Sequence, residues 1–351
     1  MIVRSCAVSV RNRARDYLSH HNGRNKKKMT RKSYRYIGVD LAVDKLDIHT
    51  EGKDLHYPNN ETGIRKLLAL VRKAGEDTLV AYESTGYVSR RFATMLFEHE
   101  VAQKCINPAW VHYYGKSLGR LAKNDRMDAE LIWSYAVHQQ VQPDYPYTKF
   151  ILQMREKVAA RRLMMKGCKK LKGALHAYNG GNRACISRII EDYKRHIAVM
   201  DTEIKETIMA SEECGPLYRA LMAEPGIGPV AASVLIAYLP ELGRVNGRTI
   251  GAIAGLVPYD HDSGRMMGRR CISGGRALVR ECMFMAETAS MTMKCWPLRD
   301  FYEKLRKTKP HKMAIVACGR RHLVHLNAKV RDWFKNGCNG TLPQVGSGEG
   351  A

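Results

Sequence analysis

Two short apolar runs that each end in a carboxylate constrain the possible fold most. Residues 36–39 precede Asp40, and residues 79–82 precede Glu83, which is followed by turn residues at positions 84–86. Apolar runs of this length, bounded by turn residues, predict buried strands. Each acid therefore stands where an α/β sheet would present a metal ligand.

A second pair of acids, Asp125 and Asp128, stands at the start of a predicted helix. Residues three apart lie on one helix face, so both carboxylates project to the same side. Carboxylates gathered in one place repel one another unless a cation lies among them, and oxygen ligands of this kind favour magnesium. Paired magnesium ions commonly break phosphodiester bonds. We therefore predict a magnesium site formed by Asp40, Glu83, Asp125 and Asp128.

Each acid by itself also has a structural explanation. Asp40 could cap a turn, and Asp125 or Asp128 could cap a helix start, where the helix dipole stabilises negative charge. Glu83 is the hardest to explain in this way. Three neighbouring acids are expected to be structural: Asp44, Asp47 and Glu130.

The charge balance indicates a polyanionic partner. The 351 residues include 58 Lys and Arg against 34 Asp and Glu, which gives a formal net charge of +24. Such an excess predicts strong, salt-sensitive binding to nucleic acid, although charge alone leaves a generic RNA-binding protein open. Hydrophobic residues make up 45% of the chain, enough for packed cores.

The cysteines argue against a zinc site. The ten cysteines form no C-x-x-C pair, which fits a reducing cytosol better than a zinc finger. No apolar run approaches the length of a membrane span, and the N-terminus has no signal-peptide core. We therefore expect a cytoplasmic protein with no membrane partner.

Patterning divides the chain into five segments. Residues 1–33 form a basic arm that we expect to be disordered, with Met1 and Met29 both open as the start. Residues 34–146 predict an α/β unit, in which a three-strand meander precedes alternating helices and strands. The expected strands lie at 34–40, 45–50, 55–57, 79–83 and 103–107, and the expected helices at 61–74, from about 86 to 98, from 108, and around 125–128.

Residues 147–214 predict a helical, coiled-coil-like connector with a hairpin near residues 179–182. Between residues 155 and 172 it carries eight basic residues and one acid, Glu156. This stretch is either a solvated helix face or a surface that follows phosphates, and we favour the second. The candidate nucleic-acid contacts are Arg161, Arg162, Lys169 and Lys170.

Residues 215–337 predict a mostly α-helical second domain, with helices expected at 276–294, 298–307 and 310–335, followed by a disordered tail over 338–351. Residues 225–229 read Pro-Gly-Ile-Gly-Pro between two apolar helices. This resembles a helix-hairpin-helix element, in which the backbone at Gly226 and Gly228 would offer N–H groups to a phosphate. A simple helix connector remains an equal alternative.

A loop over residues 259–275 combines glycines with arginines. Glycines let a backbone approach a ligand closely, and arginines bind phosphate bidentately. A serine here could attack a phosphodiester, although a serine beside a glycine is more commonly a turn residue. The candidate phosphate ligands are Arg265, Arg269, Arg270 and Arg276.

Several motifs together resemble one family. They are Ile37-Gly38-Val39-Asp40, Tyr82-Glu83-Ser84-Thr85-Gly86, Asn107-Pro108, Lys123-Asn124-Asp125-Arg126-Met127-Asp128-Ala129, Gly255-Leu256-Val257-Pro258 and Asp262-Ser263-Gly264. Their order, over roughly residues 34–335, resembles the DEDD transposases of bacterial insertion sequences, the bridge-RNA-guided serine recombinases related to the pilin-gene invertase.

The resemblance implies a RuvC-like, RNase-H-like first domain whose four acids match Asp40, Glu83, Asp125 and Asp128. It places the nucleophilic serine at Ser263, with Ser273 a weaker rival. It further implies a structured noncoding guide RNA, donor and target DNA, a homodimer or homotetramer, and action on the bacterial nucleoid. The long N-terminal arm departs from the family pattern.

Two other function classes remain to be separated from a serine recombinase. A magnesium-dependent junction-resolving nuclease would use only the acids, with Ser263 as a turn residue. A non-catalytic nucleic-acid-binding protein would carry the acids as surface residues, and magnesium would then cause no strand cleavage.

Overall fold

The computed structural model describes residues 32–119, 125–144, 148–260, 268, 270–293, 296–338 and 342. Within these ranges, the side chains of Tyr87, Asp125, Arg126 and Met127 are not described. The described residues divide into two compact units, with the boundary just before Thr148. The predicted arm and tail lie almost wholly outside the described residues.

The first unit is built on a five-stranded sheet of order β3-β2-β1-β4-β5. The β1–β2 and β2–β3 pairs are antiparallel, whereas β1, β4 and β5 are parallel neighbours. This confirms the predicted meander. The strand β4 ends at Glu83 as predicted, whereas β1 continues one residue beyond Asp40. The strands are β1 (Arg35–Leu41), β2 (Lys45–Thr50), β3 (Lys53–Pro58), β4 (Thr78–Glu83) and β5 (Ala102–Ile106).

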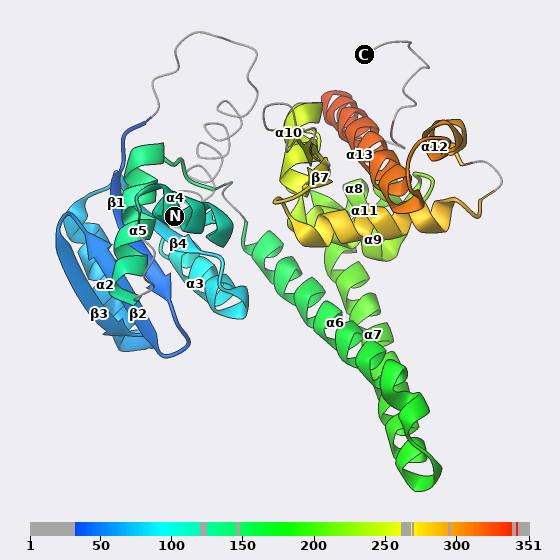
Figure 1. Ribbon diagram of the computed structural model, residues 1–351, viewed down its shortest axis with the longest axis horizontal. Coiled ribbons are helices and arrows are strands. Elements are labelled where there is room, and N and C mark those ends of the chain that lie inside the picture. The colour runs from blue at the N-terminus through cyan, green and yellow to red at the C-terminus, as the bar shows by residue number, and fades with distance from the viewer. Residues whose placement is uncertain are drawn as a thin grey trace. The chain divides into compact units, whose positions relative to one another are not determined.

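Helices cover both faces of this sheet, because successive strand residues alternate between two apolar clusters (Figure 1). Ile37 and Val39 share one cluster with residues of α2 (Glu61–Ala74) and α3 (Gly86–Glu98). Tyr36 and Ala81 belong to the opposite cluster, with residues of α4 (Pro108–Ser117) and α5 (Asp125–Gln139). The predicted mixed sheet covered by helices is therefore confirmed.

Gly38 is the point where α5 lies closest to β1. A Cβ atom added at Gly38 would lie 2.4 Å from the carbonyl oxygen of Ala129 and 2.7 Å from the backbone nitrogen of Trp133. A side chain of any size would therefore push the backbone of α5 away from the sheet. The glycine of the Ile-Gly-Val-Asp motif is thus required by packing.

The second unit begins with two long helices, α6 (Lys149–Ala174) and α7 (Gly180–Met209), which run side by side (Figure 1). Cys168, Ile190 and Ile197 form the buried seam between them. A short 3-10 turn over Leu175–Ala177 connects the pair, and the glycines expected in the hairpin instead open α7. The predicted helical pair is otherwise confirmed.

Among the described residues of the second unit there are six further helices. They are α8 (Cys214–Met222), α9 (Pro229–Tyr238), α10 (Gly247–Ala254), α11 (Ala277–Ser290), α12 (Arg299–Arg306) and α13 (His311–Lys335). The sequence did not predict α10, a short helix defined by its ends: Asn246 accepts a hydrogen bond from the Thr249 N–H, and Gly255 ends the helix with a left-handed φ of 69°. In the described part of the chain, no helix has the length and apolar character needed to cross a membrane.

The packing of α5 at Gly38 gives a first prediction. Gly38→Ala forces a methyl group against the backbone of Ala129, so we expect the free energy of unfolding to fall by about 1–3 kcal/mol. Urea unfolding followed by circular dichroism measures the change. The control is Gly173→Ala in α6, where an added Cβ meets nothing within 4 Å, so stability should be unchanged or slightly higher. Equal midpoints for Gly38→Ala and wild type would contradict this account.

Candidate active site

Asp40 and Glu83 lie side by side at one edge of the sheet. The register of the parallel strands pairs Val39 with Tyr82, so the next residues, Asp40 and Glu83, are also neighbours. Val39 and Tyr82 both belong to the cluster with α2 and α3, so the following residue on each strand projects to the opposite face, toward α5. Both acids are partly buried. The sheet therefore brings together two of the four predicted ligands.

The direction of α5 brings Asp128 to the same edge. The Tyr36 hydroxyl donates to the carbonyl of Val141, just past the end of α5, whereas Gly38 faces Ala129 and Trp133. The helix therefore runs antiparallel to β1, and its first turn lies level with Asp40. The step from Gly38 to Asp40 along the strand is about 7 Å, and four to five helix residues cover the same length. The start of α5, four residues before Ala129, therefore lies beside Asp40.

The donor chemistry at this edge suits a hard cation. Asp40, Glu83 and Asp128 offer only carboxylate oxygens, the ligands that magnesium prefers. Among the described residues, no group of three or more His, Cys, Asp or Glu lies close enough to hold a metal ion. Asp125 begins α5, but its side chain lies outside the described atoms. The ligand types suit magnesium, and the strand register places Asp40 and Glu83 at one edge, which the first turn of α5 faces.

The serine loop begins and ends at a two-stranded ladder that the sequence did not predict. Pro258 of β6 (Pro258–Tyr259) pairs with Ile272 of β7 (Cys271–Ile272). At the next position, Asp260 forms an exposed ion pair with Arg270, with 2.5 Å between Oδ1 and Nε. Three predicted site residues, Ser263, Arg265 and Arg269, lie outside the described residues.

Two glycine motifs, one just before β6 and one just after β7 in the sequence, pack against each other. A Cβ added at Gly255 would lie 2.3 Å from the Gly274 oxygen, and one at Gly275 would lie 2.3 Å from the Gly255 nitrogen. Arg280 from α11 donates to the carbonyl oxygens of Gly255 and Gly274. The Gly-Leu-Val-Pro and Gly-Gly-Arg motifs therefore form one packed junction that fixes both ends of the loop.

Arg276 is held by a buried carboxylate. Its two terminal nitrogens lie 2.5 and 2.6 Å from the carboxylate oxygens of Glu241, and Nη1 also donates to the Tyr238 carbonyl. Glu241 is fully buried. Burial raises the pKa of Glu241, but the Arg276 charge and hydrogen bonds outweigh burial, so the pKa lies below its ordinary value. Sequence reasoning assigned Arg276 to phosphate, but its guanidinium anchors the loop base.

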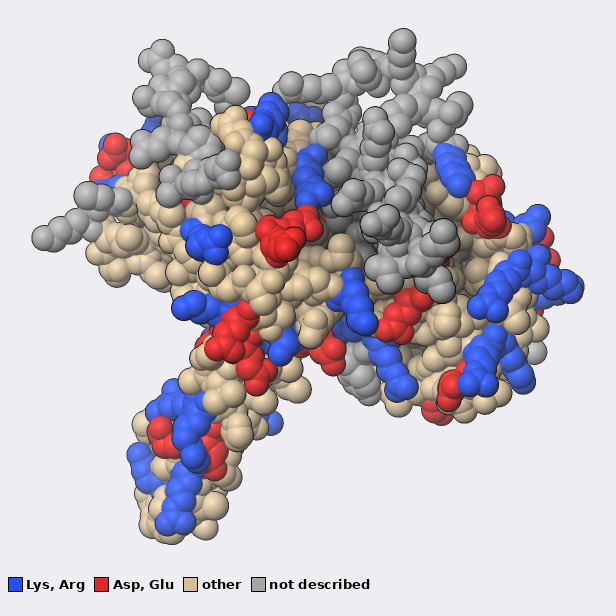
Figure 2. Space-filling view, turned by 180° about the vertical axis from the view of Figure 1, so that it is seen from behind, with Lys and Arg blue, Asp and Glu red and all other residues tan. Residues whose placement is uncertain are grey.

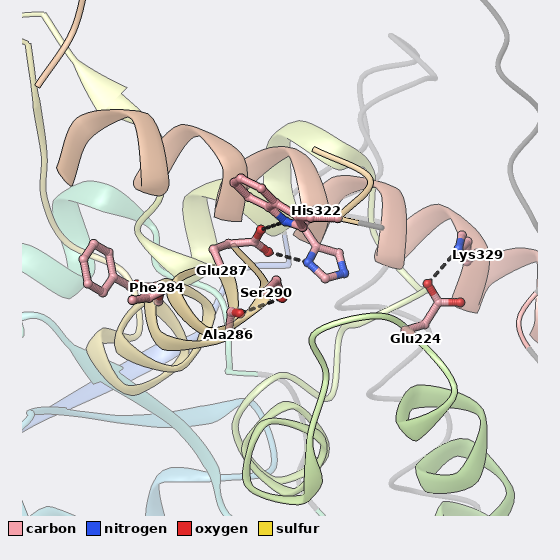
Figure 3. Close-up of polar contacts among 9 residues, drawn as sticks. Glu224, Phe284, Ala286, Glu287, Ser290, His322 and Lys329 are labelled. Atoms are coloured by element: carbon pink, nitrogen blue, oxygen red, sulfur yellow. Dashed lines mark hydrogen bonds and ion pairs between the residues drawn. The ribbon is translucent and has the colours of Figure 1, made fainter. Parts of the chain in front are cut away.

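The predicted helix-hairpin-helix element lies between α8 and α9 and packs on α11. Gly226 has a left-handed φ of 84°, and a Cβ there would lie 2.1 Å from Ser290 Oγ. Glu224 pairs with Lys329 of α13, with 2.7 Å between Oε2 and Nζ (Figure 3). An added Cβ at Gly228, in contrast, meets nothing within 4 Å. Gly226 is therefore explained by packing, and Gly228 lies on the open side of the turn.

The basic residues of the connector fall into two groups. Arg161 is paired with Asp201 of α7, and Arg162 is paired with Glu281 of α11. Lys169 and Lys170 are exposed on α6, and Figure 2 shows basic and acidic side chains mixed along the hairpin. The two arginines therefore stabilise helix packing, whereas the two lysines are exposed to solvent.

A buried polar cluster between α11 and α13 was missed from the sequence. Glu287 is fully buried, accepts a hydrogen bond from Trp296 Nε1 at 3.1 Å and pairs with His322 Nδ1 at 2.5 Å (Figure 3). Its partners are separated from it by 9 and 35 residues. No local pattern links residues so far apart, so only the folded chain identifies the cluster. It joins two helices and takes no part in the carboxylate site.

The buried ion pair at the loop base gives a second prediction. Arg276→Met leaves the Glu241 carboxylate buried without its main partner, so we expect a loss of about 3–5 kcal/mol in the free energy of unfolding. Urea unfolding of the full chain measures it. Arg270→Met is the control, because its pair with Asp260 is exposed and should change stability little. Equal effects of the two substitutions would contradict the assignment.

The lowered pKa of Glu241 gives a third prediction. A carboxyl whose pKa is lower in the folded state stabilises the fold above the ordinary glutamate pKa of about 4.3 and loses that contribution as pH falls through the folded-state value. We therefore expect Glu241→Gln to be destabilised relative to wild type at pH 7, with the difference shrinking below pH ~4.3. Urea unfolding curves of both proteins at pH 7 and at a pH below ~4.3 test this. A difference in the free energy of unfolding that grows on acidification would refute it.

Comparison with known proteins agrees with these features. Residues 37–178 match a transposase family model of the DEDD, IS110 type, and residues 218–303 match the model described as transposase IS116/IS110/IS902 family. The pilin gene-inverting proteins of Moraxella bovis and Moraxella lacunata are each 24% identical over 315 residues, covering 84% of this chain and 95% of theirs.

A shorter match points the same way. An uncharacterized 44.8 kDa protein of insertion element IS116 from Streptomyces clavuligerus is 32% identical over 136 residues, covering 38% of this chain and 33% of that protein. The two family models match successive parts of the chain, and the first spans the sheet edge where the acids meet. The chain belongs to the IS110/IS116 family of DEDD transposases, enzymes that recombine DNA.

Proposed function

We propose that this transposase cleaves and rejoins DNA with Ser263 as nucleophile and a magnesium site formed by Asp40, Glu83, Asp125 and Asp128, at DNA sites chosen by a structured noncoding RNA. The observation that carries the proposal is the meeting of Asp40 and Glu83 on neighbouring parallel strands, with α5 directing Asp128 to the same edge. A cation among these carboxylates would offset the repulsion between their like charges.

The proposed cleavage step exchanges one phosphoester for another. Ser263 Oγ forms a bond to the DNA phosphorus as the bond between phosphorus and a deoxyribose oxygen breaks. The serine proton is released and the leaving oxygen takes up a proton, so no water is consumed and the phosphoester energy is kept for rejoining. Magnesium would stabilise charge on the phosphate. The carboxylates would hold the cation at the strand ends.

The remaining site residues are proposed to hold nucleic acid. Arg265, Arg269 and Arg270 belong to the serine loop and would bind the phosphates near the reacting bond. Lys169 and Lys170 on α6, and the open turn at Gly228, would contact backbone phosphates farther away. Arg276 and Gly226 were also candidate nucleic-acid contacts. We assign Arg276 instead to supporting the serine loop, and Gly226 to supporting the hairpin between α8 and α9.

Two parts of the proposal rest on relatives. The pilin gene-inverting proteins are named for inverting DNA, which fits a reaction that both cuts and rejoins. The guide RNA, with its donor and target DNA, and assembly into a dimer or tetramer rest on the resemblance to guided recombinases. In such a system base pairing would select the sites, and the protein would bind backbone and helix shape.

One observation favours a second function. The acids and the serine loop belong to different compact units, so the first unit has the ligand set of a nuclease by itself. A junction-resolving nuclease would hydrolyse DNA with these acids and form no covalent link to Ser263.

A denaturing gel separates the two functions and gives a fourth prediction. The protein is incubated with magnesium, its flanking noncoding RNA and labelled DNA carrying the junction of the element. We expect a protein-linked DNA band in wild type, its fall below about 1% in Ser263→Ala and Asp40→Asn, and its loss when the RNA is omitted.

Ser273→Ala is the matched control, because Ser273 lies in the same loop but is not the proposed nucleophile, so its band should persist. Free cleaved ends that persist in Ser263→Ala would establish the nuclease instead. Equal binding and no cleavage in any sample would favour a non-catalytic protein.

A further inference from the structure

The turn between α12 and α13 carries a dense group of cations. Of the nine residues from 304 to 312, five are basic, and no acid occurs between Glu303 and Asp332. The group begins just beyond residue 303, where the match to the second family model ends. All five residues are exposed, and we call them the α12–α13 cations: Lys304, Arg306, Lys307, Lys309 and Lys312.

No carboxylate of the described chain neutralises these cations. None of the five forms an ion pair with a described residue, whereas Arg161, Arg276 and Lys329 are each paired with an acid. The nearest acids in the sequence, Asp300 and Glu303 of α12, are exposed and likewise form no ion pair within the described ranges. The turn therefore presents a concentrated positive charge to solvent.

The backbone that carries these side chains is held in place. Arg306 Nη1 donates to the Lys309 carbonyl oxygen at 2.7 Å, which closes the turn. The hydroxyl of Tyr302 in α12 lies 2.7 Å from Nδ1 of His311 in α13. A buried apolar cluster with members from both helices also joins α12 to α13 (Figure 1). The cations thus extend from a fixed surface.

Two of the cations stand where they oppose a helix dipole. Lys309 and Lys312 lie at the start of α13, a helix of 25 residues whose N-terminus carries partial positive charge. Cations at that end of a helix, and like charges close together, both lower the stability of the free protein. A bound polyanion would offset this repulsion. The local cost points to binding, and not to folding, as the role of these two lysines.

The surrounding surface indicates which polyanion it suits. Over the described residues 296–338, no large hydrophobic side chain is exposed. Unpaired bases stack on exposed aromatic rings, and peripheral membrane binding buries apolar side chains, so neither partner finds a matching group here. Lysine ammonium groups bind phosphates as point charges and read no bases. The recombination reaction of the family supplies duplex DNA, which carries one negative charge per about 1.7 Å of helix axis.

We propose that the α12–α13 cations bind the phosphate backbone of duplex DNA away from the reacting bonds, without regard to base sequence. The inference uses only the DNA recombination of the family, and neither the serine chemistry nor the metal site enters it. Its failure would therefore leave both of those proposals untouched.

The test is fluorescence anisotropy of the full-length protein with labelled duplex DNA, without magnesium, at ~50 to 200 mM salt. Lys309→Gln with Lys312→Gln should lower the affinity about tenfold at ~100 mM salt, and equally for two unrelated DNA sequences. The slope of log affinity against log salt concentration should become shallower by about two. Urea unfolding of the same variant should give a stability equal to or above wild type, because the removed cations oppose the helix dipole.

Two further variants serve as controls. Lys53→Gln with Lys73→Gln removes the same net charge from exposed lysines of the first unit, so its affinity should stay within about twofold of wild type. Lys309→Arg with Lys312→Arg keeps both charges and should bind DNA as wild type does.

Each other outcome decides against the inference. Wild-type affinity in Lys309→Gln with Lys312→Gln, or an equal fall in Lys53→Gln with Lys73→Gln, overturns the binding surface. A fall confined to single-stranded DNA or to duplex RNA of the same length assigns the surface to another partner and overturns the choice of duplex DNA. Lower stability in Lys309→Gln with Lys312→Gln, without recovery of binding in the arginine substitutions, would make the two lysines structural.

Discussion

The contact between α5 and β1 at Gly38 is the constraint on which the first unit depends. A helix backbone can touch a strand only where the strand has no Cβ, and here the approach would place an added atom within 2.4 Å of a helix carbonyl. That contact sets how far along β1 the helix α5 lies and in which direction α5 runs. Its first turn then falls at the carboxyl ends of β1 and β4, where Asp40 and Glu83 project. The same glycine therefore determines packing and the location of the site.

The strong positive charge of the chain overstates the surface available to nucleic acid. Arg276 is held by a fully buried carboxylate, Arg161 by Asp201 and Lys329 by Glu224. Each of these pairs joins segments distant in sequence, so these cations stabilise the fold first. Exposed lysines such as Lys169 and Lys170 are more accessible to a polyanion than these paired cations. Net charge identifies the class of partner, but ion pairing determines which residues can meet it.

The sequence predicted local order well and long-range contacts poorly. The meander, α2 and the strands that carry Asp40 and Glu83 follow from periodicity within a few residues and were confirmed, with β1 ending one residue later than predicted. The helix α10 was missed because eight residues carry too short a period, although Asn246 and Gly255 are recognisable caps. The ladder of β6 and β7 has only two residues in each strand.

For the site residues too, the sequence predicted local features but not the contacts between residues distant in sequence. Spacing alone put Asp125 and Asp128 on one helix, but only the strand register and the contact at Gly38 show which edge of the sheet that helix reaches. Arg276 was assigned to phosphate because its neighbours are glycines and arginines. Its partner Glu241 stands 35 residues earlier, and nothing in the local pattern identifies it. The partner of a charged residue is a property of the fold, so a basic motif predicts binding only after the ion pairs are known.

The two units support their chemical groups in different ways. The acids of the first unit project from strand ends and a helix start, where backbone hydrogen bonding fixes their spacing. In the second unit, the described ends of the serine loop are held by the ladder of β6 and β7, the junction of Gly255 with Gly275, and the buried pair of Glu241 and Arg276. A metal site requires several ligands at once, which suits rigid elements, whereas the proposed nucleophile would have to reach one phosphorus atom and then remain attached to the DNA end. Under the proposed serine chemistry, firm anchoring of the loop base would keep a covalently linked DNA end attached to the folded unit until rejoining.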